Sequence, residues 1–236
     1  MGRWTGLTRP RRRDGVLKRR VIPPTLALLL AAWMSLGSVV AAAAANAAVP
    51  APAAAGIERF VIDPSASEAL YRVGETFFNR NNQFKVAVGT THGIQGEILV
   101  DRGHPSQSRI GPITVDISGL ASDSRRRDRE IRSQWLESAR YPTAVFTPIT
   151  IDGLPGVYVD GRAIPVRIAG NLEVHGVTKS VTFAGTVTLA GQSLTGDATA
   201  NVLMTDFGFD PPSLLGFLQA QNQVELEIQF TAHRAP

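Results

Sequence analysis

Alternation of apolar and polar residues dominates this chain from about residue 57 to its end. In the last such segment, Val224, Leu226 and Ile228 interleave with Glu225 and Glu227. Period-two alternation is the pattern of a half-buried β-strand, because successive side chains point to opposite faces of a sheet. Similar segments lie at 113–117, 166–174 and 181–189, and weaker ones at 57–63, 69–75, 84–88, 93–100, 143–151 and 198–204. About ten such segments predict an all-β domain.

Strands with one apolar face can bury it in a sandwich of two sheets or in a barrel that closes on itself. Several of the expected strands reach about eight to ten residues, and long strands favour a barrel because its strands are tilted. We therefore expect an antiparallel β-barrel of about eight or more strands. The interior of such a barrel is wide enough for one slender ligand or for side chains alone. The pattern leaves both alternatives open.

One short amphipathic helix interrupts the strands between residues 120 and 146. Asp123 or Ser124 can accept hydrogen bonds from the free N–H groups of its first turn. Its apolar residues are Ile131, Trp135 and Leu136, and its opposite, solvent-facing side is expected to carry Arg125, Arg126, Asp128, Arg129, Glu130 and Arg132. Asp128 precedes Arg132 by four residues, the order that favours an ion pair. The helix is predicted to be a lid that turns its apolar face toward the barrel.

The first 49 residues have the order of a secretory signal. Eight basic residues precede an apolar run at 21–40 and then an alanine-rich tract with A-x-A sites that end at Ala45 and Ala47. The alternative is a retained membrane anchor, since residues 26–49 are nearly long enough to span a bilayer. A Pro/Ala linker at 50–56 leads to the domain at 57–236. We expect an extracytoplasmic protein, periplasmic or secreted, and membrane-anchored if the leader is retained.

The charge balance changes once this leader is set aside. The leader holds eight of the 24 basic residues and one of the 20 acidic ones, so 16 basic and 19 acidic residues remain, a net charge of −3. Without a global positive field, nucleic acid is not an expected partner. The chain has no cysteine, which excludes disulfides, thiolate metal sites and a cysteine nucleophile.

Candidate catalytic groups are sparse. A lipid-acting hydrolase or isomerase would draw its acid–base groups from Asp123, Asp128, His175 and Asp206. There is no Gly-x-Ser-x-Gly elbow, and the four histidines show no metal-ligand spacing. His175 and Gly176 lie between two alternating segments, which predicts a hairpin turn. We therefore expect no catalytic residue, no metal and no cofactor.

An ordered set of motifs extends over about 180 residues. In chain order they are Ile62-Asp63-Pro64, Arg127-Asp128, Tyr141-Pro142 with Phe146, Gly170-Asn171-Leu172, His175-Gly176-Val177-Thr178-Lys179 and Asp206-Phe207-Gly208. This set resembles the YceI-like family. The resemblance implies a lipocalin-like antiparallel barrel whose lumen holds a polyisoprenoid or a similar amphiphile. The chain departs from the family in residues 77–82, where the family more often has a shorter connection.

These inferences combine into one hypothesis. The protein is expected to be an exported, non-enzymatic carrier or sequestering protein whose partner is a long-chain amphiphile such as a polyisoprenoid. The alternatives are a lipid-acting enzyme of the same fold and a structural β-domain with a filled core. A homodimer stays open. The residues expected to line the lumen or its mouth are Phe84, Val86, Ile98, Ile113, Val115, Trp135, Phe146, Phe183 and Phe207.

Overall fold

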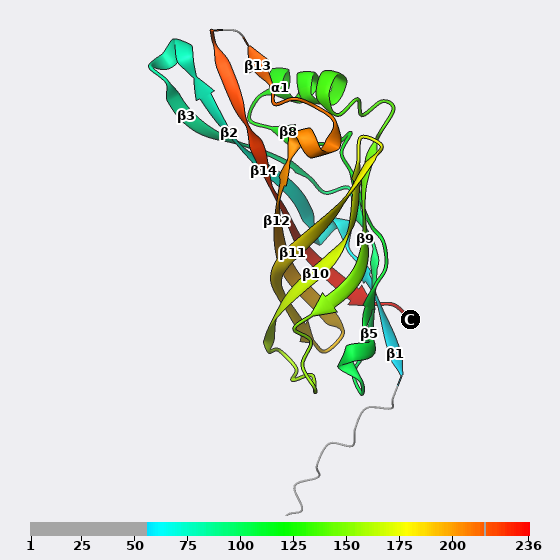
Figure 1. Ribbon diagram of the computed structural model, residues 1–236. Helices are drawn as coiled ribbons and strands as arrows, with labels where there is room; N and C mark the ends of the chain where they lie inside the picture. The colour runs from blue at the N-terminus through cyan, green and yellow to red at the C-terminus, as the bar shows by residue number, and fades with distance from the viewer. Residues whose placement is uncertain (1–55, 215) are drawn as a thin grey trace, which may run out of the picture. The chain divides into compact units, whose positions relative to one another are not determined.

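The structure, a computed structural model, describes residues 56–214 and 216–236 (Figure 1). The predicted leader and nearly all of the linker lie outside these residues. The first strands are β1 (Ile57–Ile62), β2 (Glu68–Phe77), β3 (Gln83–Thr91), β4 (Ile94–Gln95), β5 (Glu97–Asp101), β6 (Arg109–Ile110), β7 (Ile113–Asp116) and β8 (Ala121–Ser122). Helix α1 (Arg125–Glu130) precedes β9 (Thr143–Asp152), β10 (Ala163–Val174), β11 (Val177–Ala190), β12 (Ser193–Leu203), β13 (Ser213–Leu214) and β14 (Leu218–Arg234). All ten predicted strand segments coincide with strands.

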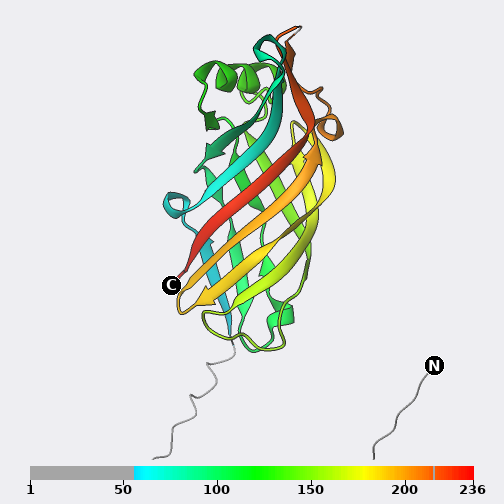
Figure 2. The same ribbon diagram turned by 90° about the vertical axis from the view of Figure 1, so that its left-hand side faces the viewer.

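The strands form one antiparallel sheet that curls into a barrel (Figure 2). Its order runs β4, β7, β9, β10, β11, β12, β14, β1, β5 and β6. Only Gly96 separates β4 from β5, and both pair with the β6–β7 segment. Pairing therefore closes a ring of β1, β4–β5, β6–β7, β9, β10, β11, β12 and β14. The expectation of an antiparallel barrel of about eight strands is confirmed.

A break near residue 63 makes the two ends of this barrel different. Asp63 caps a short 3₁₀ turn at Pro64–Ala66, and this turn separates β1 from β2. β1 pairs with β5 and completes the ring, whereas β2 pairs with β3 and leaves the ring. β3 in turn pairs only over two residues with β8. We call the end of the barrel where β2 and β3 leave the ring the helix end. The opposite end, where β1 begins, is called the far end.

Helix α1 lies between β8 and β9 at the helix end (Figure 1). It starts after Ser124, whose Oγ accepts a hydrogen bond from the backbone N–H of Arg127. Ser124, rather than Asp123, is thus the N-cap. The helix continues as a π-helical turn at Ile131–Trp135. No helix among the described residues has both the length and the apolar character needed to cross a membrane.

Alternation along each strand directs one row of side chains into the barrel. The largest core cluster includes Phe60, Ile94 and Leu189, which are almost completely buried. The hairpin at His175 and Gly176 joins β10 to β11 as expected, with positive φ angles of 54° and 73° that suit a two-residue turn. The core and all strands described lie within residues 57–234, so this part of the chain can fold on its own.

Candidate functional site: an apolar lumen in two compartments

Two neighbouring cavities occupy the barrel interior. The one at the helix end has a volume of about 190 Å³, and the one toward the far end has a volume of about 100 Å³. Ile113, Phe146, Phe183 and Ile228 line both, so they mark the boundary between a helix-end compartment and a far compartment. An apolar cavity of about 150 Å³ is enough to bind benzene. The lumen is therefore partly open rather than filled by side chains.

The boundary contains an edge-to-face pair of aromatic rings. The ring centroids of Phe146 and Phe183 are 4.9 Å apart at an interplanar angle of 68°. Phe146 comes from β9 and Phe183 from β11, and both side chains are buried. The two rings therefore stand where the two compartments meet.

The far compartment is almost entirely apolar. Its lining includes Val100, Ile164, Val166 and Leu194. The exceptions are Ser108 and Tyr158, whose hydroxyl oxygens lie 3.1 Å apart and hydrogen-bond to each other. Burial raises the pKa of Tyr158, although the hydrogen bond with Ser108 opposes that shift. This compartment offers an apolar guest no charged group.

The helix-end compartment combines an apolar wall with charged groups. Its apolar lining includes Ile131, Trp135 and Leu136. The predicted lid face of the helix therefore does line the cavity. Tyr71, Glu75, Arg127 and Glu227 also line this compartment.

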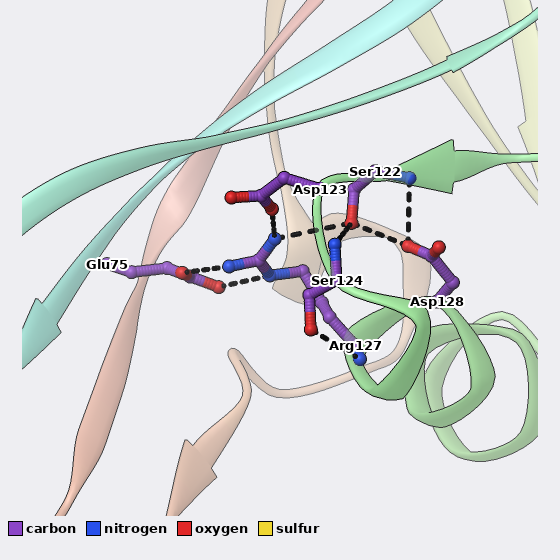
Figure 3. A network of polar contacts seen from close by, with 6 residues as sticks. All are labelled: Glu75, Ser122, Asp123, Ser124, Arg127 and Asp128. Atoms are coloured by element: carbon purple, nitrogen blue, oxygen red, sulfur yellow. Dashed lines mark hydrogen bonds and ion pairs between the residues drawn. The ribbon is translucent and has the colours of Figure 1, made fainter.

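An ion pair between Glu75 and Arg127 ties the helix to β2 (Figure 3). Nε and Nη2 of Arg127 donate to the two carboxylate oxygens of Glu75 over 3.0 and 2.9 Å. Nη1 of Arg127 donates to Ser122 and to Asp123. Burial alone would lower the pKa of Arg127, but the hydrogen bonds to Asp123 and Glu75 raise it above its ordinary value. Arg127 therefore stays charged, and its charge is compensated.

Asp128 corrects the predicted solvent face of the helix. It is buried, and its Oδ1 accepts hydrogen bonds from the backbone N–H and the hydroxyl of Ser122 over 3.0 and 2.6 Å (Figure 3). The expected side-chain pair with Arg132 does not form, because Arg132 donates to the carbonyl oxygens of Asp128 and Ser118. Periodicity assigned Asp128 to solvent because it could not detect a partner on β8.

Tyr71 lies beside this network and depends on a glycine. An ideal Cβ at Gly89, its cross-strand partner on β3, would lie only 2.3 Å from a ring carbon of Tyr71. Glycine at this position therefore leaves room for the ring. Burial raises the pKa of Tyr71 to about 12, although the positive charge of Arg127 acts in the opposite direction.

Seven of the nine predicted lumen residues line the cavities: Ile98, Ile113, Val115, Trp135, Phe146, Phe183 and Phe207. Phe84 and Val86 do not. They are 55% and 52% exposed on β3, and the inward positions of that strand are taken by residues such as Ala87 and Gly89. The prediction assumed that larger apolar residues face inward, and on β3 they face outward. Ligand contact by the other seven residues stays a prediction.

The candidate acid–base groups do not converge. Asp123 and Asp128 belong to the network around Arg127, and Asp206 is exposed near the end of β12. His175 lies 3.1 Å from Glu137, between the rings of Tyr141 and Phe209. No hydrogen bond or ion pair among the described residues joins His175 or Asp206 to the two aspartates. Within the same residues, no group of three His, Asp or Glu side chains is arranged to hold a metal.

Sequence reasoning missed Glu75 and Tyr71. Both lie on the inward face of β2, where the residues at 69, 71, 73 and 75 are Ala, Tyr, Val and Glu. An acidic residue that continues an inward apolar row requires a buried partner. That break in the pattern could have indicated Glu75. Its pairing with an arginine 52 residues later could not be derived from it.

Comparison with known proteins identifies relatives of this chain. Residues 60–232 match the sequence model of the YceI-like domain. A UPF0312 protein of Pseudomonas fluorescens is 25% identical over 207 residues, which cover 85% of this chain and 99% of the relative. A UPF0312 protein of Vibrio vulnificus is 26% identical over 155 residues, which cover 65% of this chain and 76% of the relative.

Two solved structures share the fold. BcnA of Burkholderia cenocepacia aligns with a TM-score of 0.56 and 16% identity over 72% of this chain and 98% of its own. A polyisoprenoid binding domain from Saccharophagus degradans aligns with a TM-score of 0.53 and 10% identity over 76% of this chain and 100% of its own.

Proposed function

The chain belongs to the YceI-like domain family, and on that premise we propose that it is an exported, non-enzymatic carrier that holds a long-chain amphiphile in its barrel. The observation that carries the proposal is the partly open lumen, whose two compartments meet at Phe146 and Phe183. A concave site lined mainly by apolar side chains selects an apolar guest. Two compartments in line suit a slender chain better than a compact molecule.

The distribution of polar groups supports one orientation of the guest. The far compartment is apolar apart from Ser108 and Tyr158, whereas the helix-end compartment has Glu75 and Arg127 in its wall. We place the apolar tail in the far compartment and the polar end of the amphiphile beside the helix. Arg127 already gives hydrogen bonds to Glu75, Ser122 and Asp123. The buried part of the guest is therefore expected to be uncharged.

An isoprenoid-like chain is the favoured guest within this class. The Saccharophagus degradans domain with this fold is a polyisoprenoid binding domain. An isoprenoid or fatty chain also matches the aliphatic and aromatic lining found here. The sequence and the lumen together do not favour an enzyme, since His175 and Asp206 are not hydrogen-bonded or ion-paired to the other candidate groups in the part of the chain that is described.

Export rests on the leader alone. We propose that the mature protein begins near Asn46 or Ala48, after one of the two A-x-A sites. N-terminal sequencing of protein isolated from its native host tests this directly. Protein that still begins at Met1 and sediments with the membranes would instead indicate a retained anchor.

Mass spectrometry of organic extracts tests the carrier proposal. The protein is purified without detergent, extracted, and compared with a mock purification from cells that lack it. A long-chain isoprenoid or fatty amphiphile at about one per protein is the expected result. Conversion of such a compound by the protein would support an enzyme, and a clean extract would support the structural β-domain.

A further inference from the structure

Large apolar side chains are exposed at the tips of two neighbouring hairpins. Phe78 and Phe84 belong to the β2–β3 hairpin and are 47% and 55% exposed. Leu214 and Phe217 belong to the β13–β14 hairpin and are 51% and 59% exposed. Single exposed apolar residues are common on protein surfaces, but a contiguous group is not and usually marks an interaction site.

The two tips form one surface. The backbone N–H of Phe78 donates to the carbonyl of Phe217 over 2.9 Å, and Phe77 pairs with Leu218. Both tips project from the barrel on the same side as helix α1 (Figures 1 and 2). They therefore lie at the helix end, beside the larger compartment.

Basic residues surround these tips. Arg80, in the turn of the β2–β3 hairpin, lies over the ring of Phe77 at 5.5 Å, and Lys85 follows Phe84. Arg125 and Arg126 are exposed on α1, and among the described residues none of these four cations has an ion-pair partner. Arg102, near the start of β1, pairs instead with Glu58 and Asp160. At the helix end, the four cations that are unpaired within the described residues therefore accompany the exposed apolar side chains of the two tips.

We propose that the two hairpin tips, together with the exposed arginines of α1, dock the protein on an anionic lipid bilayer with its helix end toward the membrane. Aromatic and aliphatic side chains insert into the interfacial region of a bilayer, and neighbouring cations are attracted to anionic headgroups. This arrangement places the helix-end compartment next to the lipid from which an amphiphile is taken or to which it is delivered. The docking itself does not depend on the identity of the guest.

A lipid surface fits these residues better than a second copy of the chain. The apolar side chains stand on protruding hairpin tips, whereas a stable protein interface needs an extended, complementary area. A two-fold dimer would also place the same patch of each copy together. Arg80 and Lys85 would then face their own counterparts across the interface.

Cosedimentation with vesicles tests the proposal. The chain from Ala48 onward is used, because the leader is itself apolar and the domain has its own core. Vesicles of phosphatidylcholine alone are compared with vesicles made of equal amounts of phosphatidylcholine and phosphatidylglycerol. We expect binding to the anionic vesicles that weakens as salt is added. No binding to the anionic vesicles would overturn the proposal.

Variants locate the docking surface. The double variant Phe78→Ser with Phe217→Ser should weaken vesicle binding by at least about tenfold, because it removes two rings that would be buried in the bilayer. The matched control replaces Ile149 and Val157 with Ser. These side chains are 67% and 73% exposed, but they lie in β9 and in the loop that follows it, away from these tips. The control should bind like the unaltered protein. Equal binding by the tip variant would overturn the assignment.

Charge variants and oligomeric state complete the test. Arg80→Gln and Lys85→Gln should each reduce binding about fivefold, while Arg162→Gln, in the exposed β9–β10 loop, should not. All these side chains are exposed, so melting temperatures should stay unchanged. Light scattering provides the competing outcome: a dimer that the tip variant dissociates, without vesicle binding, would show that the patch binds a second copy.

Discussion

The far half and the helix half of the barrel are closed by different means. In the far half, β1 pairs with β5 and β14, so backbone hydrogen bonds complete the wall. In the helix half, β2 and β3 leave the ring, and a helix held by side chains covers the gap. Breaking a strand pair disrupts many backbone hydrogen bonds at once, whereas moving the helix changes side-chain contacts such as those of Arg127 and Asp128. The helix end is therefore the expected route for a guest.

The two halves also treat polar groups differently. The far compartment contains two hydroxyl groups that satisfy each other, Ser108 and Tyr158. The helix-end compartment contains an ion pair whose members come from β2 and α1. A buried ion pair contributes little net stability against an apolar replacement, but losing one partner is costly. We infer that the pair fixes the position of the helix more than it stabilises the domain.

The largest expected effect lies at the boundary that both compartments share. Phe183→Asp should cost about 3 to 5 kcal/mol, because it places an unpaired charge in an apolar lumen. Chemical denaturation measures the loss, and lipid extraction should yield an empty or unfolded protein. Thr182→Asp is the matched control, since Thr182 faces outward on the same strand. Equal tolerance at both positions would contradict the assigned faces of β11.

The ion pair should show a smaller but specific effect. Glu75→Gln removes the buried counter-charge of Arg127 and leaves only the exposed Asp123 as its acidic partner. It should cost about 2 to 3 kcal/mol, less than for a fully buried pair because 19% of the Arg127 side chain is exposed. The double variant Glu75→Gln with Arg127→Met should recover part of this loss. Additive losses in the double-variant cycle would show that the two residues do not act as a pair.

The free energy of unfolding should depend on alkaline pH because Tyr71 ionises at a different pH in the folded and unfolded states. An unfolded tyrosine ionises near pH 10, while burial raises the folded pKa of Tyr71 to about 12. Its contribution is complete below pH 10 and is lost as the pH rises toward 12, at most about 2 to 3 kcal/mol. Tyr71→Phe should reduce this alkaline loss of stability. If the Tyr71→Phe variant lost as much stability between pH 10 and 12 as the unaltered protein does, the burial of the phenol would be contradicted.

The smallest effect on stability is expected at the lid, where it should be accompanied by faster release of the guest. Trp135 is partly buried, so Trp135→Ala should cost about 1 to 2 kcal/mol, less than for a fully buried ring. A fluorescent fatty or prenyl probe should nevertheless leave faster, because the ring lines the helix-end compartment. Arg126→Ala, on the exposed side of α1, should change neither quantity. If the probe left the Trp135→Ala variant at the same rate as the unaltered protein, the helix would not be a lid.

The sequence predicted the barrel well because alternation is a local property. β14, β10 and β11 each alternate in the printed sequence, and their faces agree with the structure at positions such as Phe183 and Leu226. The rule failed on β3, where Ala87 and Gly89 face inward. At these positions the neighbouring strand β2 fills the interior, because the ring of Tyr71 occupies the space beside Gly89.

The site was predicted less completely because its polar part depends on distant contacts. The apolar face of the helix, with Ile131 and Trp135, followed from helical spacing. Asp128 could not be assigned from that spacing, since its partner Ser122 precedes the helix. Glu75 and Arg127 are 52 residues apart, and they meet only because the fold places α1 against β2.

The account depends most on one guest lying across both compartments, with its tail at the far end. A prenyl alcohol with a photoreactive diazirine at its terminal carbon tests this directly, once bound, irradiated and mapped by peptide mass spectrometry. We predict adducts on far-compartment residues such as Val100, Ile164 and Leu194. Adducts confined to Trp135, Phe207 or the outer surface would contradict a continuous lumen that holds the tail at its far end.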